Sequence, residues 1–207
     1  MHISDAYTQW AATYDTDHNL TRDLDATMTR QALSGQRYGA ALELGCGTGK
    51  NTALLANISG RVYALDFSEG MLAQAKAKIK AEHVQFTLAD LTQPWPCSTA
   101  CVELVVCNLV LEHIRDLDFI FEEAGRVLAE GGQFYISELH PFKQYQGKKA
   151  VFQRGGAQTE IPAFVHHISD FVASAQKAGF ALTKLGEWWH DDDPPDTPRL
   201  VTFLFTK

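Results

Sequence analysis

Three glycines spaced two residues apart are the first residues in the chain whose type and spacing could do chemistry. They are Gly45, Gly47 and Gly49; a short apolar run and Glu43 precede them, and a helix-like stretch follows. A strand, a tight turn and a helix start are typical of the first unit of a doubly wound α/β fold. Glycine lets the backbone turn sharply and approach a ligand closely, and the free N–H groups of the next helix favour an anionic ligand group.

Spacing excludes two phosphate-binding motifs at this turn. The dinucleotide fingerprint would require its third glycine at Lys50. The phosphate loop would require a glycine at Leu44 and Ser or Thr at Asn51. From its spacing alone, the turn is either a cofactor site of another kind or a tight turn without further function.

Two acids follow the next two predicted strands. Asp66 ends the run that begins at Arg61 and comes 21 residues after Gly45, so it belongs at the carboxyl end of the second strand, beside the glycine turn. A carboxylate there can accept both hydroxyl protons of a ribose; the alternative is a helix N-cap, a role that Ser68 can also fill. Asp90 follows the third strand, where a lone Asp is more often a turn former.

The elements that must position these residues alternate between strands and helices. The run at 101–108 is nearly continuous in apolar residues, as in a central parallel strand buried on both faces. An acidic turn at 190–198 joins the last two strands into an antiparallel pair. Strands are predicted at 40–45, 61–66, 84–89, 101–108, 133–138, 181–189 and 200–205, and helices at 6–15, 23–34, 49–58, 69–80, 117–128 and 169–179.

The combination of Glu-x-Gly-x-Gly-x-Gly, Asp66, Asp90 and the pattern Arg-Val-Leu-x-x-Gly-Gly at 126–132 resembles the class I S-adenosylmethionine-dependent methyltransferases. Glu103, where the family usually has Asp, is a mild departure. The resemblance covers 40–140 well and implies a Rossmann-like α/β fold: a doubly wound, seven-stranded, mostly parallel sheet with a terminal antiparallel strand and helices on both faces. It further implies one domain over 1–207.

The resemblance also implies where S-adenosylmethionine, and its product S-adenosylhomocysteine, would bind. In this family the glycine loop passes beneath the methionine part, an acid like Asp66 binds the ribose, and an acid like Asp90, with the next backbone N–H, binds the adenine. The segment after the fourth strand lines the path of the methyl group. The implied cofactor residues are Tyr14, Glu43, Gly45, Cys46, Gly47, Gly49, Asp66, Phe67, Met71, Asp90, Leu91, Asn108, Leu109, Val110 and His113.

Two aromatic-rich segments are expected to cover the pocket and contact the acceptor. In the first, 1–35, a helix places Tyr7, Trp10 and Tyr14 on one face, either as a lid or as simple packing against the domain. The second is 140–170, a long insert with a short hairpin. Their aromatic content favours a small, partly apolar acceptor.

Methyl transfer to an O, N, S or C nucleophile depends mainly on alignment, so no catalytic triad is expected. A general base is needed only if the nucleophile holds its proton; the candidates are His113, His140 and His166, with Glu138 beside His140. Two other readings stay open: a noncatalytic cofactor- or partner-binding domain with the same fold, and a nucleotide-dependent oxidoreductase, which Lys50 disfavours.

Composition sets the remaining expectations. A net charge of −7 over 207 residues argues against nonspecific binding to nucleic acid or anionic membranes. No apolar run is long enough to cross a membrane, no secretory signal is visible, and four scattered cysteines favour reduced thiols. His190 beside three aspartates is interpreted as a solvated turn, so no metal is expected. These features predict a cytoplasmic monomer or homodimer whose partner is a small molecule.

Overall fold

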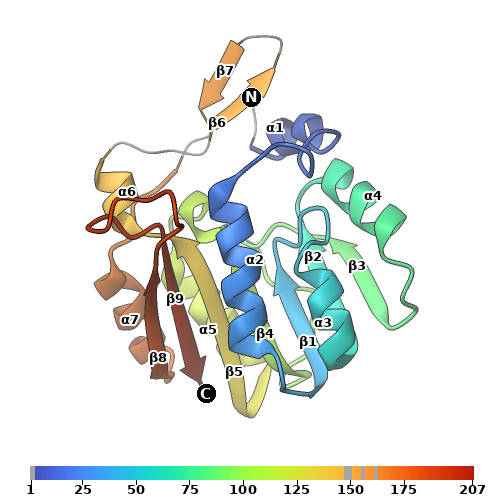
Figure 1. Cartoon of the computed structure of the whole chain (residues 1–207). Coiled ribbons are helices and arrows are strands. Elements are labelled where there is room, and N and C mark those ends of the chain that lie inside the picture. Colours follow the sequence, from blue (N-terminus) through green and yellow to red (C-terminus); the bar gives the residue numbers. More distant parts are fainter. Residues whose placement is uncertain (1–2, 147–150, 155–156, 161–162) are drawn as a thin grey trace.

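The computed structural model describes residues 3–146, 151–154, 157–160 and 163–207, and their core is one seven-stranded sheet (Figure 1). The strand order is β3-β2-β1-β4-β5-β9-β8. The first five strands in this order run parallel, and β9 pairs antiparallel with both β5 and β8. The predicted doubly wound sheet with a terminal antiparallel strand is confirmed. The strands are β1 Tyr38–Leu44, β2 Ser59–Asp66, β3 Val84–Leu88, β4 Val102–Asn108, β5 Leu128–Leu139, β8 Ala181–Trp188 and β9 Leu200–Thr206.

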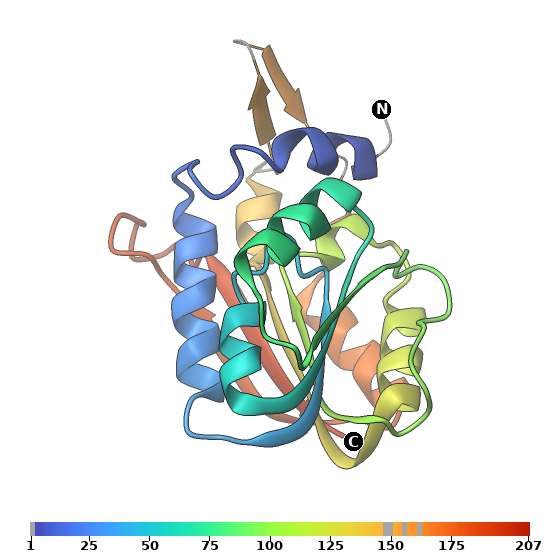
Figure 2. The same cartoon turned by 90° about the vertical axis from the view of Figure 1, so that its right-hand side faces the viewer.

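Helices cover both faces of the sheet, as Figure 2 shows from its edge. On one face Leu33 of α2 and Leu55 of α3 pack on Ala41 and Val62, and Leu72 of α4 packs on Ala64. Successive side chains of a strand point to opposite faces of the sheet. The alternate residues of the same strands therefore face the other side, where α5 and α7 pack on them. The helices are α1 Ile3–Trp10, α2 Leu20–Leu33, α3 Thr52–Ile58, α4 Glu69–Lys78, α5 Leu117–Val127, α6 Pro141–Tyr145 and α7 Ile168–Lys177, with a 3₁₀ turn, η1, at Leu111–His113.

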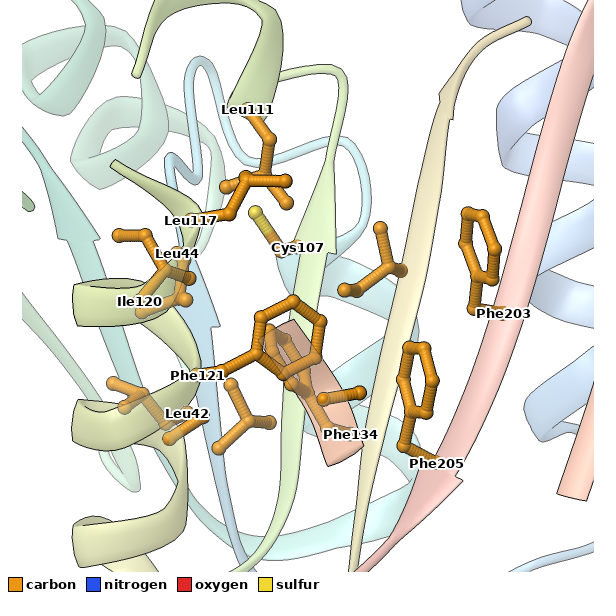
Figure 3. Close-up of a cluster of buried hydrophobic side chains, with 14 of the residues drawn as sticks. Leu42, Leu44, Cys107, Leu111, Leu117, Ile120, Phe121, Phe134, Phe203 and Phe205 are labelled. Atoms are coloured by element: carbon orange, nitrogen blue, oxygen red, sulfur yellow. The ribbon is translucent and has the colours of Figure 1, made fainter. Parts of the chain in front are cut away.

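The larger core cluster lies beneath α5 and α7 and is rich in aromatic rings (Figure 3). The ring of Phe121 lies 5.3 Å from those of both Phe134 and Phe205, in edge-to-face geometry. Such ring pairs contribute about 0.5–1.5 kcal/mol beyond their buried area. This cluster holds β5 and β9 together and fixes the carboxyl ends of the parallel strands.

Three predicted boundaries were wrong. The helix expected from residue 49 begins at Thr52, because Gly49, with φ +87°, still belongs to the turn. The first helix ends at Trp10, so Tyr14 lies in the turn that follows it. The fifth strand, predicted from residue 133, begins at Leu128, so Gly131 and Gly132 lie within β5, where the pairing with β4 shifts register between Val102 and Leu104.

The insert at 140–170 contains α6 and an antiparallel hairpin, β6 Val151–Arg154 and β7 Ala157–Glu160, so the expected hairpin is present. In Figure 1 the hairpin lies above the carboxyl edge of the main sheet. Parts of the predicted insert, at 147–150, 155–156 and 161–162, lie outside the described residues. Among the described helices, none combines the length and the apolar character that a membrane span would need.

Candidate active site

A cavity of about 330 Å³ lies at the carboxyl edge of the parallel strands, within the size range of small-molecule sites. Its walls come from the ends of β1, β2, β3 and β4 and from the segment around α1. The lining residues are Tyr7, Tyr14, Gly45, Gly47, Asp66, Phe67, Met71, Asp90, Leu91, Thr92, Asn108, Leu109, Val110, His113 and Ile114.

The glycine loop forms the floor of this cavity. Gly45 has φ +67°, a left-handed conformation that favours glycine, and a Cβ on it would lie 2.3 Å from Cγ2 of Val110. Glycine at this position therefore allows the loop after β1 to touch the segment after β4. Cys46 N donates to Leu65 O over 2.9 Å, which ties the loop to β2.

Asp66 connects the glycine loop to the start of α4. Its two carboxylate oxygens accept from Gly47 N and Ser68 N, each at 2.8 Å, and its side chain is buried. Burial raises the pKa of Asp66, against the opposing effect of these hydrogen bonds. Ser68 accepts from Met71 N over 3.2 Å and caps α4, the role that the sequence left open to it. A carboxylate has about four acceptor sites, so Asp66 keeps acceptor capacity for a ligand.

Asp90 lies at the far end of the cavity, on the turn after β3. It accepts from Thr92 N at 2.9 Å and from Thr92 Oγ1 at 2.7 Å, so it is the turn former that its position indicated. It also lines the cavity, and the buried Leu91 follows it. Asp90 thus shapes the turn and also lines the cavity.

The segment after β4 is held in a strained conformation. Leu109 has φ +57°, which is uncommon for a residue with a side chain and clusters at functional sites. Glu138, at the end of β5, accepts from Val110 N at 2.9 Å and Leu111 N at 2.8 Å. Burial raises the pKa of Glu138 to about 8. This buried carboxyl group therefore anchors the turn that carries Asn108 and His113.

Asn108 is oriented by the second helix. Its Nδ2 donates to Asp25 Oδ1 at 2.6 Å and to Thr29 Oγ1 at 2.8 Å. Burial raises the pKa of Asp25, while its hydrogen bond from Asn108 opposes the shift. A residue of the N-terminal region therefore orients a cavity residue that lies 83 positions away in the sequence.

The segment around α1 forms one wall of the cavity. The Tyr7 ring lies 5.8 Å from that of Phe67 and 5.7 Å from that of His113. Asp15 accepts from Thr48 Oγ1 of the glycine loop and from Lys78 Nζ of α4, each at 2.6 Å. These contacts hold Tyr7 and Tyr14 at the cavity; the role of this segment as a lid stays a prediction.

Three predicted cofactor residues lie outside the cavity lining. Glu43 is buried beneath the loop and accepts from Thr52 Oγ1 at 2.5 Å, and burial raises its pKa to about 8. Cys46 packs on Ala64 and Leu72. Gly49 faces α4, where a Cβ would lie 2.7 Å from Ile79 Cδ1. All three support the loop from behind.

Three residues of the cavity lining were not predicted from the sequence: Tyr7, Thr92 and Ile114. Tyr7 shares the predicted aromatic face of the first helix, and that signal could have identified it. Thr92 and Ile114 directly follow predicted segments, but their types carry no chemical signal.

Of the three candidate histidines, only His113 lies in the cavity lining. His140 Nδ1 accepts from Phe142 N at 3.1 Å as the N-cap of α6, and its Nε2 donates to Glu187 Oε1 at 2.8 Å. His166 Nε2 donates to Ile114 O at 2.7 Å. Both of these histidines hold structure next to the site.

The lining chemistry fits a cationic ligand with an apolar surface. Asp66 and Asp90 supply negative charge, tyrosine and phenylalanine rings supply faces that attract cations, and no lysine or arginine is among the lining residues described above. The sulfonium and ammonium groups of S-adenosylmethionine match this character. Within the described residues, no group of three or more His, Cys, Asp and Glu side chains is arranged to hold a metal ion.

The chain is similar to known methyltransferases. Residues 42–136 match the family model described as a methyltransferase domain. An uncharacterized methyltransferase of Emericella nidulans is 30% identical, over 87% of this chain and 76% of that protein. A ubiquinone biosynthesis O-methyltransferase of Xanthomonas oryzae is 25% identical, over 76% of this chain and 65% of that protein.

Among solved structures, the N-methyltransferase NodS of Bradyrhizobium japonicum, in complex with S-adenosyl-L-homocysteine, superposes with a TM-score of 0.76. It is 16% identical, and the match covers 100% of this chain and 99% of that one. Sequence, sheet order and the glycine loop lead to one conclusion: the chain belongs to the class I S-adenosylmethionine-dependent methyltransferases.

Proposed function

We propose that this protein transfers the methyl group of S-adenosylmethionine to a small-molecule acceptor in the cavity at the carboxyl edge of its sheet. One observation carries the proposal: the order of the lining groups along that edge. Because the strands run β3-β2-β1-β4, the edge presents Asp90, then Asp66, then the glycine loop, then the segment from Asn108 to His113. The cofactor presents adenine, ribose and methionine part in the same order, and its transferable methyl group, on the sulfonium between the ribose and the methionine chain, would face the segment after β4.

The residues have separate roles in this proposal. Asp90, with Leu91, holds the adenine, Asp66 accepts hydrogen bonds from the ribose hydroxyls, and the loop at 45–49 lies beneath the methionine part. The cofactor supplies an activated methyl group on a sulfonium. The protein supplies alignment of the acceptor with the methyl group and the sulfur, which suffices for a reaction of this kind.

A small acceptor is supported by the lid contacts, which leave a cavity of molecular size rather than an open groove. The name of the ubiquinone biosynthesis relative is that of a small-molecule methyltransferase, which agrees with this choice. The N-terminal segment and the insert at 140–170 stay the predicted covers of the site; no described residue of the insert is among the cavity lining. Four further points stay predictions: the single-domain layout with these two covers, the monomeric or homodimeric state, the cytoplasmic location and the absence of nucleic-acid partners.

Calorimetry with S-adenosylhomocysteine and with NAD tests the cofactor assignment. We expect saturable binding of the first and none of the second. Asp66→Ala should weaken S-adenosylhomocysteine binding by about 1–3 kcal/mol, the scale for a lost charged hydrogen-bond partner. Asp116→Ala is the matched control, because Asp116 caps α5 outside the cavity lining. Equal binding by both variants would contradict the assignment of Asp66.

Turnover separates an enzyme from a noncatalytic domain of the same fold. A panel of hydroxyl, amine, thiol and carbon acceptors is incubated with methyl-labelled S-adenosylmethionine, and transfer to at least one of them is expected. Tyr14→Ala should then raise the KM for that acceptor severalfold. Tight cofactor binding without transfer to any panel member would favour the noncatalytic alternative.

A further inference from the structure

The crossover from β3 to β4, residues 89–101, is described in full and contains no helix, although it joins two parallel strands of the sheet. Its first part lies at the carboxyl edge, where residues 90–92 line the cavity. Its last part lies at the opposite edge, because β4 begins there, at Val102. Cys97 and Cys101 lie in this last part. One short segment therefore joins the cavity to a pair of cysteines.

The thiols of Cys97 and Cys101 are neighbours. Burial, and next the Cys101 thiol, raise the pKa of Cys97 to about 11, while the charge of Arg126 opposes this shift. The same guanidinium interacts with the Cys101 thiol as well. Both side chains are partly exposed and pack against the core cluster beneath α5, whereas Cys46 and Cys107 are buried. A soluble oxidant therefore reaches the pair at 97 and 101 and not the other two cysteines.

A tight loop brings the two cysteines together. Ala100, between them, has φ +52°, a conformation that residues with a side chain rarely adopt. Ala100 N donates to Arg126 O at 2.9 Å, and Cys101 N donates to Val127 O at 2.8 Å. Arg126 Nη1 donates to Cys97 O at 2.6 Å. The end of α5 therefore holds both ends of the loop 97–101.

A disulfide between these cysteines would move the Cys97 end of the loop. Its sulfur atoms must approach to about 2.05 Å, closer than two thiols in contact, and Cys101 is held in place because it leads directly into β4. Cys97 N donates to Trp95 O at 2.7 Å, and the buried Trp95 donates from Nε1 to Leu91 O at 3.1 Å. Movement of Cys97 is therefore transmitted through Trp95 to Leu91 in the cavity lining.

We propose that Cys97 and Cys101 form a redox-modification site, at which a hydroperoxide joins the two sulfur atoms in a disulfide that weakens cofactor binding at Leu91. The effect on the cofactor rests on the proposed function, whereas formation of the disulfide does not. Small thiols would reduce the disulfide again by exchange.

The chemistry is a two-electron oxidation in two steps. The hydroperoxide transfers its outer oxygen to one thiol, which becomes a sulfenic acid, and an alcohol or water is released. The second thiol then attacks the sulfenic sulfur; the S–O bond breaks, and the hydroxide takes the thiol proton and leaves as water. The two sulfur atoms together lose two electrons, which the O–O bond of the peroxide accepts.

Mass spectrometry of the full-length protein treated with hydrogen peroxide tests the disulfide. After denaturation and alkylation, Cys97 and Cys101 should be unlabelled, with a mass lower by two hydrogen atoms, while Cys46 and Cys107 carry the label. Dithiothreitol should restore labelling of all four. Cys97→Ser and Cys101→Ser should each abolish the disulfide. Ser98→Ala, at an exposed position inside the loop, is the matched control and should oxidise as the wild type does. Labelling of both thiols after peroxide, or a disulfide to any other cysteine, would overturn the proposal.

Calorimetry with S-adenosylhomocysteine tests the link to the cavity. The Kd of the oxidised wild type should be at least about fivefold higher than that of the reduced protein, the low end of typical coupling between two sites. Dithiothreitol should reverse the change. Peroxide-treated Cys97→Ser and Cys101→Ser should keep their untreated Kd, because neither can form the disulfide.

The outcomes of this experiment are distinct. A wild type that contains the disulfide and binds with the Kd of the reduced protein would overturn the link, and so would an equal loss of affinity in the two serine variants. Failure of the reduced wild type to bind S-adenosylhomocysteine would instead contradict the proposed function.

Discussion

At the scale of single residues, the acids at this edge differ in whether they line the cavity or hold the glycine loop in place. Asp66 does both, because it lines the cavity and also accepts from Gly47 N and Ser68 N. Glu43 faces away and is buried against Thr52. Of the two acids in the sequence pattern, one therefore lines the cavity and the other supports the loop from inside.

Glu43 makes a pH-dependent contribution to stability. Its pKa is about 8 in the folded protein because it is buried, and about 4.3 in the unfolded chain. A raised carboxyl pKa contributes stability that is complete below about pH 4.3 and is lost as the pH rises to about 8. The loss approaches about 1.4 kcal/mol per pH unit within this window.

Glu43→Gln resembles the protonated acid and should remove that loss. We expect the free energy of unfolding of the variant, measured with urea on the ligand-free protein, to increase relative to that of the wild type as the pH rises from 5 to 9. The outcome that contradicts the account is a constant difference between the two proteins across this range.

Some site residues could be predicted from sequence, and others could not. Asp66 and the glycines are fixed by the geometry of one strand–turn–helix–strand unit, so spacing alone identifies them. The Tyr7–His113 and Asn108–Asp25 contacts join residues 106 and 83 positions apart. They depend on how the N-terminal segment docks, which no local pattern encodes. The left-handed conformation of Leu109 is likewise imposed by Glu138 and by neighbouring strands.

At the scale of elements, the docking of α1 on α4 determines whether the cavity is closed. A Cβ on Gly70, in the first turn of α4, would lie 2.9 Å from Thr8 O and 3.0 Å from Thr8 Cα. The hydroxyl groups of Thr8 and Ser68 lie 2.9 Å apart beside it. Glycine is a poor helix former, so its presence here is explained by the close approach of the lid.

Gly70→Ala should separate lid closure from stability. The methyl group would displace α1, and with it Tyr7, so the Kd for S-adenosylhomocysteine should rise about tenfold, or about 1.4 kcal/mol. Alanine is more favourable than glycine in a helix by up to about 1 kcal/mol, so the Tm of the variant should not fall. Gly125→Ala in α5 is the matched control, since its Cβ would meet its nearest atom, Phe180 Cε2, at 3.6 Å. Equal Kd values for both variants would contradict the lid contact.

Element order could be predicted because alternating strand and helix patterns in a parallel sheet admit few arrangements. Boundaries were less predictable. The start of β5 at Leu128 depends on its pairing with Val102, and the start of α3 depends on the extended turn around Gly49. Both are tertiary effects, and neither alters which strand ends carry the site.

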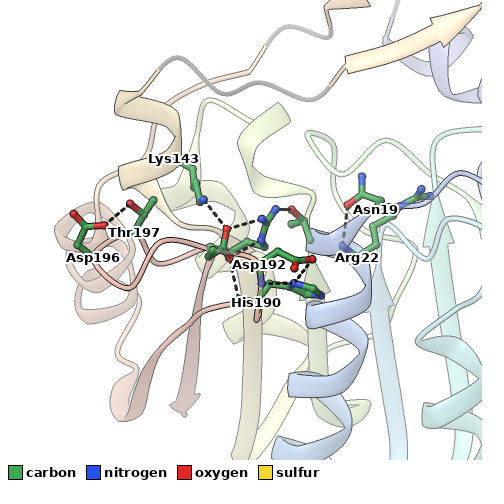
Figure 4. A network of polar contacts seen from close by, with 10 residues as sticks. Asn19, Arg22, Lys143, His190, Asp192, Asp196 and Thr197 are labelled. Atoms are coloured by element: carbon green, nitrogen blue, oxygen red, sulfur yellow. Dashed lines mark hydrogen bonds and ion pairs between the residues drawn. The ribbon is translucent and has the colours of Figure 1, made fainter.

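At the scale of the whole molecule, an ionic network joins segments from both halves of the chain (Figure 4). Asp193, in the turn between β8 and β9, accepts from Lys143 Nζ of α6 at 2.9 Å and from Arg199 Nε at 2.8 Å. Arg199 Nη1 donates to Thr21 Oγ1 of α2 at 3.2 Å. The network therefore links the last strand pair to the insert and to the helix that orients Asn108.

Asp193→Asn should destabilise the protein by about 1.5–3 kcal/mol at pH 7, because it removes a buried acceptor for two cations. Burial alone would raise the pKa of Asp193, but the hydrogen bonds from Arg199 and Lys143 hold it at about 2. The stabilisation is therefore complete above the unfolded pKa, about 3.9, and is lost as the pH falls through 2. Chemical unfolding at pH 7 and pH 2.5 measures it.

Asp191→Asn, an exposed position in the same turn, is the control and should change stability by less than about 0.5 kcal/mol. A penalty for Asp193→Asn that is undiminished at pH 2.5 would show that the ionised carboxylate is not its source.

The most direct test of the central claim is a crystal structure of the full chain grown with S-adenosylhomocysteine. The account predicts ligand density in the cavity, with the adenine near Asp90, the ribose hydroxyls on Asp66, and the thioether sulfur directed toward the segment from Asn108 to His113. Density in another place, or the reverse orientation along the sheet edge, would contradict it.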